Sequence, residues 1–144
     1  MLESVFWPMS YQLSGLNRLS KAIIGSAIEV HREMGPGLLE SIYERCLHAE
    51  LSRRGLRVES QVQLPLTYKG EVLNKALILD LVVEDSIILE LKAVEVILPV
   101  HSAQLLSYLR LTGKPMGLLL NFCVPVMSKG IVRRLNDRVQ LIRS

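Results

Sequence analysis

The stretch LILDLVVEDSIILELKAVEVIL, Leu77 to Leu98, combines long apolar runs with isolated charges. Two runs of leucine, isoleucine and valine are separated by the polar residues 84–86, which is the pattern of two buried strands joined by a short turn. Three charged residues interrupt these apolar runs: Asp80, Glu90 and Lys92. Burying unpaired charge is costly, so we interpret these three residues as candidates for function.

The register of this hairpin predicts where the charges lie. Side chains alternate across a strand, so Glu90 and Lys92 share one face. If the three polar residues form the turn, Val83 pairs with Ile87, and Asp80 lies directly opposite Glu90. Opposed side chains have Cβ atoms about 4.5–5.5 Å apart, which lets one cation contact both carboxylates.

The charge balance of this trio predicts a bound cation. Two carboxylates in apolar surroundings repel each other and lose hydration, so one is protonated unless a cation compensates. Lys92 alone neutralises only one of them. We therefore expect Mg²⁺, with Mn²⁺ as an alternative, bound through oxygen ligands. The competing interpretation is a cross-strand ion pair of Asp80 with Lys92 that leaves Glu90 in solvent, but the apolar flanking residues argue against a solvated edge.

The segments before this stretch predict two helices. Apolar spacing indicates a first helix over Leu19–Met34, with Ser20 as its N-cap and residues 35–37 (GPG) ending it. A second helix is expected from about Leu38 to Arg54. The inward residues are predicted to be Ile23, Ile24, Ala27, Ile28 and His31 in the first helix, and Leu39, Ile42, Cys46, Leu47 and Leu51 in the second.

The remaining segments predict further strands and a third helix. VESQVQLPLTYKG alternates with period two, and YKGE indicates a hairpin turn. HSAQLLSYLRLTG has helical spacing, PMGLLLNF is typical of a strand buried on both faces, and GIVRRLNDRVQLIRS favours a strand with a ragged end. The order predicts an α/β domain with a mixed central β-sheet flanked by helices, spanning residues 19–144 after an N-terminal extension of residues 1–18.

Composition limits the classes of protein. A chain of 144 residues with 49% hydrophobic content fits one domain, and a net charge of +3 permits a nucleic-acid partner without requiring one. Cys46 and Cys123 have no metal-ligand spacing, which fits a reducing cytoplasm. The uncharged run of residues 115–128 is too short and too interrupted to span a bilayer, so we expect a cytoplasmic protein with no membrane partner.

The segment GLLESIY, Gly37 to Tyr43, matches the signature of the GxxExxY family, which is placed in the PD-(D/E)XK nuclease superfamily. The chain resembles this family over nearly its whole length, through IIGSAIEVHREMGPGLLESIYE, YKG, LDLVVEDSIILELKAVE and AQLLSYLRLTGKPMGLLLNF. The resemblance implies a PD-(D/E)XK (restriction-endonuclease-like) core. That core contains a helix, a three-strand meander, a second helix and a further strand.

The resemblance also implies an active site. Asp80 matches the acidic residue of one strand, and Glu90 and Lys92 match the E-x-K of the next. The backbone carbonyl of Leu91 is a further metal ligand in this interpretation, and Glu40 of the helical motif joins the site.

The roles of several further positions are open or weighed against simpler interpretations. Glu44 shares a helix flank with Glu40 and rivals it for the helical role. Gln104 either lies near the scissile phosphate or is an ordinary helix residue, and Tyr108 is favoured as a packing residue. The basic residues of the C-terminal segment fit a phosphate-contacting surface, although a solvated face is the simpler interpretation.

The resemblance implies a Mg²⁺-dependent nuclease that hydrolyses phosphodiester bonds, with DNA favoured over RNA, and a homodimer is compatible with the sequence. The alternative is a non-catalytic nucleic-acid- or protein-binding module on a nuclease-like scaffold. Retention of all three strand charges favours the enzyme, whereas the modest net charge and few aromatic residues favour the module.

Overall fold

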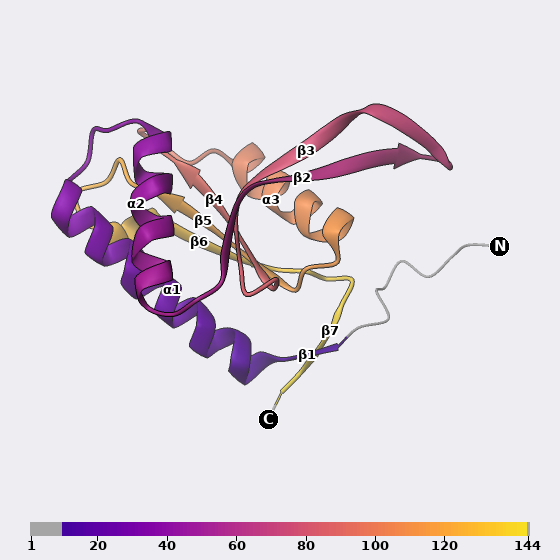
Figure 1. The fold of residues 1–144 in the computed structure, drawn as a ribbon, viewed down its shortest axis with the longest axis horizontal. Helices are drawn as coiled ribbons and strands as arrows, with labels where there is room; N and C mark the ends of the chain where they lie inside the picture. Colours follow the sequence, from indigo (N-terminus) through magenta and orange to yellow (C-terminus); the bar gives the residue numbers. More distant parts are fainter. Residues whose placement is uncertain (1–9, 144) are drawn as a thin grey trace.

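A five-stranded mixed sheet with helices on both faces forms the body of the protein (Figure 1). The computed structural model describes residues 10–143. The strand order is β2-β3-β4-β5-β6, in which β4 and β5 are parallel and the other neighbours are antiparallel. The predicted α/β class and its mixed, helix-flanked sheet are therefore confirmed. The elements are β1 Ser10–Gln12, α1 Leu13–Met34, α2 Glu40–Arg53, β2 Val58–Tyr68, β3 Glu71–Val83, β4 Ile87–Lys92, α3 Pro99–Thr112, β5 Met116–Asn121, the 3-10 helix η1 Met127–Gly130, β6 Ile131–Leu135 and β7 Gln140–Ile142.

The sheet separates two apolar clusters. The larger cluster packs α1 and α2 against one face, and the smaller packs α3 against the other. Strand β5 is buried along its whole length, as its uninterrupted apolar sequence predicts. The C-terminal segment forms β6 at the edge of this sheet, which confirms the predicted strand. The predicted ragged end is wrong, because β7 follows and pairs in parallel with β1 in a separate two-stranded sheet. No helix within residues 10–143 is long and apolar enough to cross a membrane.

Helix α1 begins at Leu13, which corrects the predicted start at Leu19. Leu13 and Leu16 are buried, so the apolar spacing of the helix continues toward the N-terminus beyond the predicted cap. Ser20 is not an N-cap: it is buried inside the helix, and its hydroxyl donates to the carbonyl of Asn17 at 3.2 Å. The division of the chain at residue 19 stays a prediction.

The rotation of the first two helices also differs from the prediction. Leu39 and Ile42 are 70% and 38% exposed, and Ile28 of α1 is 44% exposed, although all three were expected to face inward. The ring of Tyr43 stacks on Phe122 with centroids 4.5 Å apart, and this contact fixes which side of α2 faces the sheet. The buried side of α2 consists of Tyr43, Leu47 and Leu51.

Strands β2 and β3 form a long arm that projects from the body (Figure 1). The predicted YKGE turn closes this arm, and Lys69 and Gly70 have φ of 48° and 83° there. At the base, Val83 pairs with Ile87, so the predicted three-residue turn between β3 and β4 is confirmed.

Candidate active site

Asp80 lies just beyond the point where the pairing of β3 and β4 ends. The unpaired position between the two strands, at Asp80 and Glu90, is called the acidic opening. Ladder pairing of these strands ends at Leu81 with Leu89. Counting one residue further places Asp80 opposite Glu90, as the register predicts, yet this position has no ladder pair. The backbone groups at the opening therefore need other partners.

The two carboxylates supply those partners. The N–H of Leu91 donates to Asp80 Oδ2 at 2.9 Å, and the N–H of Asp80 donates to Glu90 Oε2 at 3.4 Å. Each carboxylate thus accepts from the backbone of the opposite strand. This exchange brings the two acidic side chains together at the opening.

Glu90 is a buried acid with an unsatisfied oxygen. Glu90 is 7% exposed, and its Oε1 atom has no hydrogen-bond partner among the described residues. Burial raises the pKa of Glu90 to about 9, and hydrogen bonding with the Asp80 side chain and repulsion from its charge act in the same direction. The backbone N–H of Asp80 and the positive charge of Lys92 oppose this shift in pKa. Without a cation, Glu90 is therefore protonated at neutral pH.

Lys92 is half-buried and shares the strand face of Glu90 by alternation. No ion pair within residues 10–143 includes Lys92, so the alternative of a simple Asp80–Lys92 pair is not formed. Its ammonium group acts on Glu90 through space, where it lowers the carboxyl pKa.

The carbonyl of Leu91 faces the same opening. The N–H and C=O of one strand residue point to the same side, and the N–H of Leu91 points toward Asp80 on β3. The next carbonyl, that of Lys92, points the other way and accepts from the N–H of Phe122 at 3.0 Å. Leu91 thus adds a backbone oxygen beside the two carboxylates.

Residues of the GLLESIY motif, Gly37 to Tyr43, determine the conformation of the loop before α2. Gly37 has φ of +100°, a conformation that favours glycine. The buried hydroxyl of Tyr43 donates to the carbonyl of Gly35 at 2.5 Å and accepts from the N–H of Leu38 at 3.0 Å. The loop held in this way leads into Glu40, the first residue of α2.

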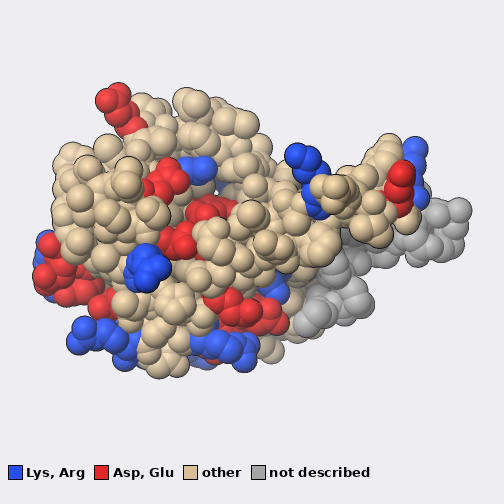
Figure 2. All heavy atoms as spheres, turned by 45° about the horizontal axis from the view of Figure 1, so that its top comes forward, with Lys and Arg blue, Asp and Glu red and all other residues tan. Residues whose placement is uncertain are grey.

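Glu40 and Glu44 contact different parts of the site. Glu40 Oε2 accepts from the N–H of Ala93, directly after β4, at 3.2 Å. The carboxylate of Glu44 accepts from Gln61 Nε2 of β2, at 2.8 and 3.1 Å. Burial is the main cause that raises the pKa of Glu44, and the charge of Asp80 adds to it. Figure 2 shows acidic side chains gathered in a hollow in the middle of one face, near the base of the arm.

Tyr108 and Gln104 lie on α3. Burial and, to a smaller extent, the negative charges of Glu90 and Asp80 raise the pKa of Tyr108. Tyr108 also packs against the smaller cluster, as expected of a packing residue. Gln104 is exposed, and no hydrogen bond among the described residues joins it to the pair.

The acidic pair has the donor set for a hard cation. Within residues 10–143 no group of three or more Asp, Glu, His or Cys side chains lies close enough to hold a metal ion. Asp80, Glu90 and the Leu91 carbonyl supply three oxygens, one of them the unsatisfied Oε1 of Glu90. Mg²⁺ typically keeps several waters and needs only one or two carboxylates, so these residues fit it.

Asn121, which no sequence motif distinguishes, supports the chain after the end of β4. Asn121 is 2% exposed, and its Nδ2 donates to the carbonyl of Val94 at 2.8 Å. Its Oδ1 accepts from the N–H of Val94 at 3.1 Å and of Cys123 at 3.2 Å. Asn121 therefore fixes the chain two residues after Lys92. The only sequence signal was a polar residue at the end of an apolar strand.

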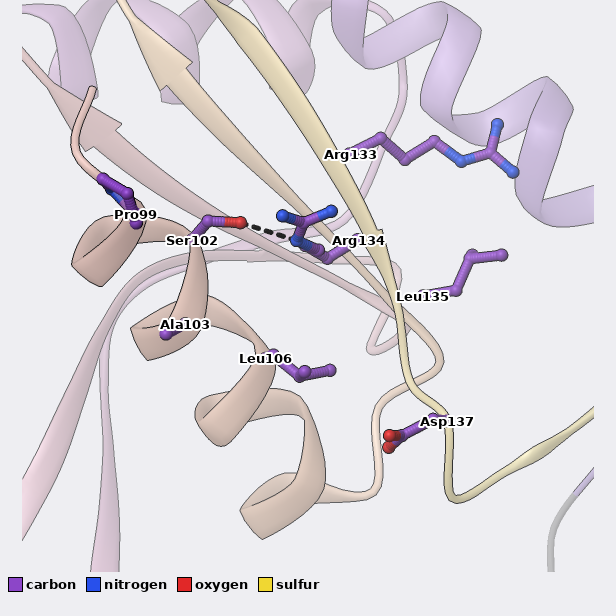
Figure 3. Close-up of a pocket in the computed structure, with 8 residues that line it drawn as sticks. All are labelled: Pro99, Ser102, Ala103, Leu106, Arg133, Arg134, Leu135 and Asp137. Atoms are coloured by element: carbon purple, nitrogen blue, oxygen red, sulfur yellow. Dashed lines mark hydrogen bonds between the residues drawn. The ribbon is translucent and has the colours of Figure 1, made fainter. Parts of the chain in front are cut away.

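A groove of about 840 Å³ lies elsewhere, between α3 and β6 (Figure 3). Arg134 points into it and donates from Nε to the Ser102 hydroxyl at 2.6 Å, whereas Arg133 points away. Asp137 at the groove forms an ion pair with Arg110. None of the residues at the acidic opening lines this groove.

The mixed sheet, the helices on its two faces, and an acidic residue beside an E-x-K strand define a nuclease-like α/β protein. The family model for the PD-(D/E)XK nuclease superfamily matches residues 17–135, and the chain belongs to this superfamily. No curated protein and no solved structure matches the chain. Membership implies a nucleic-acid substrate and a divalent metal for the class as a whole.

Proposed function

We propose that this protein is a Mg²⁺-dependent nuclease that hydrolyses phosphodiester bonds, with DNA preferred over RNA and Mn²⁺ able to replace Mg²⁺. The observation that carries the proposal is the convergence of Asp80 and Glu90, with Glu90 Oε1 buried and unsatisfied. Without a cation this arrangement costs stability at neutral pH, because burial and the charge of Asp80 force Glu90 to take up a proton.

Four groups would hold the cation in this proposal. Asp80, Glu90 and the Leu91 carbonyl offer oxygens at the opening, and Glu40 supplies another directly or through water. When bound, the cation lowers the pKa of a coordinated water and stabilises charge on the phosphoryl oxygens.

The remaining residues act on the substrate and the attacking water. Lys92, which has no ion-pair partner in the described part of the chain, would orient the attacking water and stabilise negative charge that develops on the phosphate. Gln104 is exposed on α3 and is available to contact the scissile phosphate or its neighbour.

The family and cellular setting extend the proposal. Gly37, Glu40 and Tyr43 support placement in the GxxExxY family, because each has a distinct structural role in the motif. Cys46 and Cys123 are both free, which suits a cytoplasmic protein. A homodimer stays a proposal.

A non-catalytic binding module is the second candidate. The observation that favours it is that no three-side-chain metal group forms within residues 10–143. In this case the acidic opening would bind no divalent cation, and nucleic acid or protein would bind elsewhere on the scaffold.

Cation titration separates the two candidates. Isothermal calorimetry with Mg²⁺ and Mn²⁺ is expected to detect binding to the wild type and not to Asp80→Ala. Asp85→Ala is the matched control, because Asp85 lies in the adjoining turn and pairs with Lys114 at the surface. Cleavage of single-stranded DNA, duplex DNA and RNA of one sequence then tests the substrate preference. Absence of cation binding by the wild type would exclude the nuclease and leave the binding module.

A further inference from the structure

Gln61 has an unusual backbone for its position. It lies inside β2 with φ of 51°, in the left-handed region that disfavours residues other than glycine. The other described non-glycine residues with positive φ are Lys69, Glu84 and Asp85, and all three lie in turns between strands. Such backbone strain within a strand points to a local role for the side chain.

The register places Gln61 beside the acidic pair. In the β2–β3 ladder, Ser60 pairs with Leu81 and Val62 with Leu79, so Gln61 stands opposite Asp80 with no ladder pair. Asp80 in turn stands opposite Glu90. In a regular strand the Gln61 side chain would lie on the same face as its neighbours in this row. The left-handed backbone gives it a different direction.

The redirected amide contacts Glu44. Gln61 Nε2 donates to both carboxylate oxygens of Glu44, at 2.8 and 3.1 Å. Both residues line a pocket of about 440 Å³ between α2 and β2. The charge of Asp80 helps to raise the pKa of Glu44, so Glu44 lies near the pair. Among the described residues neither Glu44 nor Glu40 forms a three-side-chain metal-binding group with the pair, and the contacts of the two glutamates distinguish them.

We propose that Gln61 is a positioning residue whose amide holds the Glu44 carboxylate away from the bound cation. Glu40, and not Glu44, is then the helical glutamate that contributes to the site. This inference rests on the proposed nuclease function and deepens it. Both oxygens of Glu44 are engaged by one amide, whereas Glu40 reaches the end of β4 at Ala93. Release of Glu44 would add a further carboxylate to the opening, and a higher count of charged ligands tightens cation binding.

The test is the Mn²⁺ dissociation constant, measured by calorimetry without nucleic acid. Gln61→Gly accepts the left-handed backbone and removes the amide, and it is expected to bind Mn²⁺ about three- to tenfold more tightly than the wild type. The double variant Gln61→Gly with Glu44→Gln is expected to return to the wild-type value. Glu44→Gln alone should also bind like the wild type. Lys69→Gly is the matched control, because it changes a residue with φ of 48° at the distant tip of the arm and should leave the constant unchanged.

The possible outcomes separate this inference from the proposed function. If the wild type binds Mn²⁺, Asp80→Ala does not, and Gln61→Gly binds like the wild type, the role of Gln61 is wrong and the nuclease proposal stands. Weaker binding by Glu44→Gln alone would make Glu44 a ligand and would also overturn the inference. If the wild type binds no cation, both proposals fail. Should Gln61→Gly not fold, Gln61→Asn replaces it, because asparagine tolerates the left-handed region and its shorter amide releases Glu44.

Discussion

Asp80 and Glu90 lie opposite each other at the point where β3 and β4 separate, and each carboxylate accepts a hydrogen bond from the backbone of the other strand. The strand pairing is thus replaced by side chains at this one position. The arrangement leaves a buried carboxylate oxygen free, and it explains why a core strand contains a glutamate.

Replacement of Glu90 by glutamine tests the electrostatic cost of the pair. Glu90→Gln resembles the protonated acid and needs no proton from solution, so at pH 7 in chelator we expect a free energy of unfolding higher than that of the wild type by roughly 1–3 kcal/mol. Cleavage and stabilisation by Mg²⁺ should both be lost. Denaturant unfolding with chelator and with excess Mg²⁺ measures this. A variant that Mg²⁺ stabilises as much as the wild type would contradict the assignment of Glu90.

The pKa of Glu90 predicts a pH dependence of stability. The folded-state pKa of about 9 lies above the ordinary value of 4.5, so the folded protein holds the extra proton between these limits. The contribution of Glu90 to the free energy of unfolding is fully present below pH 4.5. It is lost as the pH rises through about 9, at up to about 1.4 kcal/mol per pH unit. Urea unfolding of the metal-free wild type and of Glu90→Gln at pH 5, 7 and 8.5 measures this loss. The free energy of unfolding of the variant should exceed that of the wild type by an amount that grows with pH. A constant difference would contradict the raised pKa.

Lys92→Ala should behave differently from the carboxylate variants. Removal of Lys92 leaves the two acidic groups without their positive neighbour, so we expect a loss of about 1 kcal/mol of stability in chelator, together with loss of cleavage. Thermal melting of Lys92→Ala in chelator checks this. Lys114→Ala is the control, because it removes a lysine whose ion pair with Asp85 lies away from the opening. Equal melting of Lys92→Ala and the wild type would indicate that Lys92 does not act on the pair.

Tyr43→Phe tests the motif before α2. The substitution keeps the ring on Phe122 and removes the hydroxyl that bonds to Gly35 and Leu38. We expect a destabilisation of about 1–2 kcal/mol and a reduced cleavage rate, because the loop leading to Glu40 loses its anchor. Tyr108→Phe is the control for loss of a phenol near the site. If Tyr43→Phe is as stable and active as the wild type, the hydroxyl does not position Glu40.

The sequence predicted the register of the β3–β4 hairpin because a three-residue turn and strict alternation leave one pairing that buries the apolar residues. It did not predict the rotation of α2, because the neighbouring residues Ile42 and Tyr43 point to different sides of the helix and either can face the core. The stacking of Tyr43 on Phe122 accompanies the burial of Tyr43, and Ile42 is exposed. The sequence predicts a start of α1 that is six residues too late, because Ser20 fits a capping pattern although it lies inside the helix.

Two site features could not be read from the sequence for a different reason. The left-handed backbone of Gln61 depends on the opening of two ladders around Asp80, which is a tertiary effect. The contacts of Asn121 join segments far apart along the chain. Neither has a local pattern that distinguishes it from an ordinary polar residue.

In the proposed site, Asp80 and Glu90 bind a divalent cation, and Glu90 releases a proton when the cation binds. Calorimetric titration with Mn²⁺ at pH 7, in two buffers of different ionisation enthalpy, measures the number of protons released on binding. We expect the wild type to release about one proton and Glu90→Gln to release none, because the cation must displace the proton held by Glu90. Cation binding without proton release, or no binding at all, would contradict it.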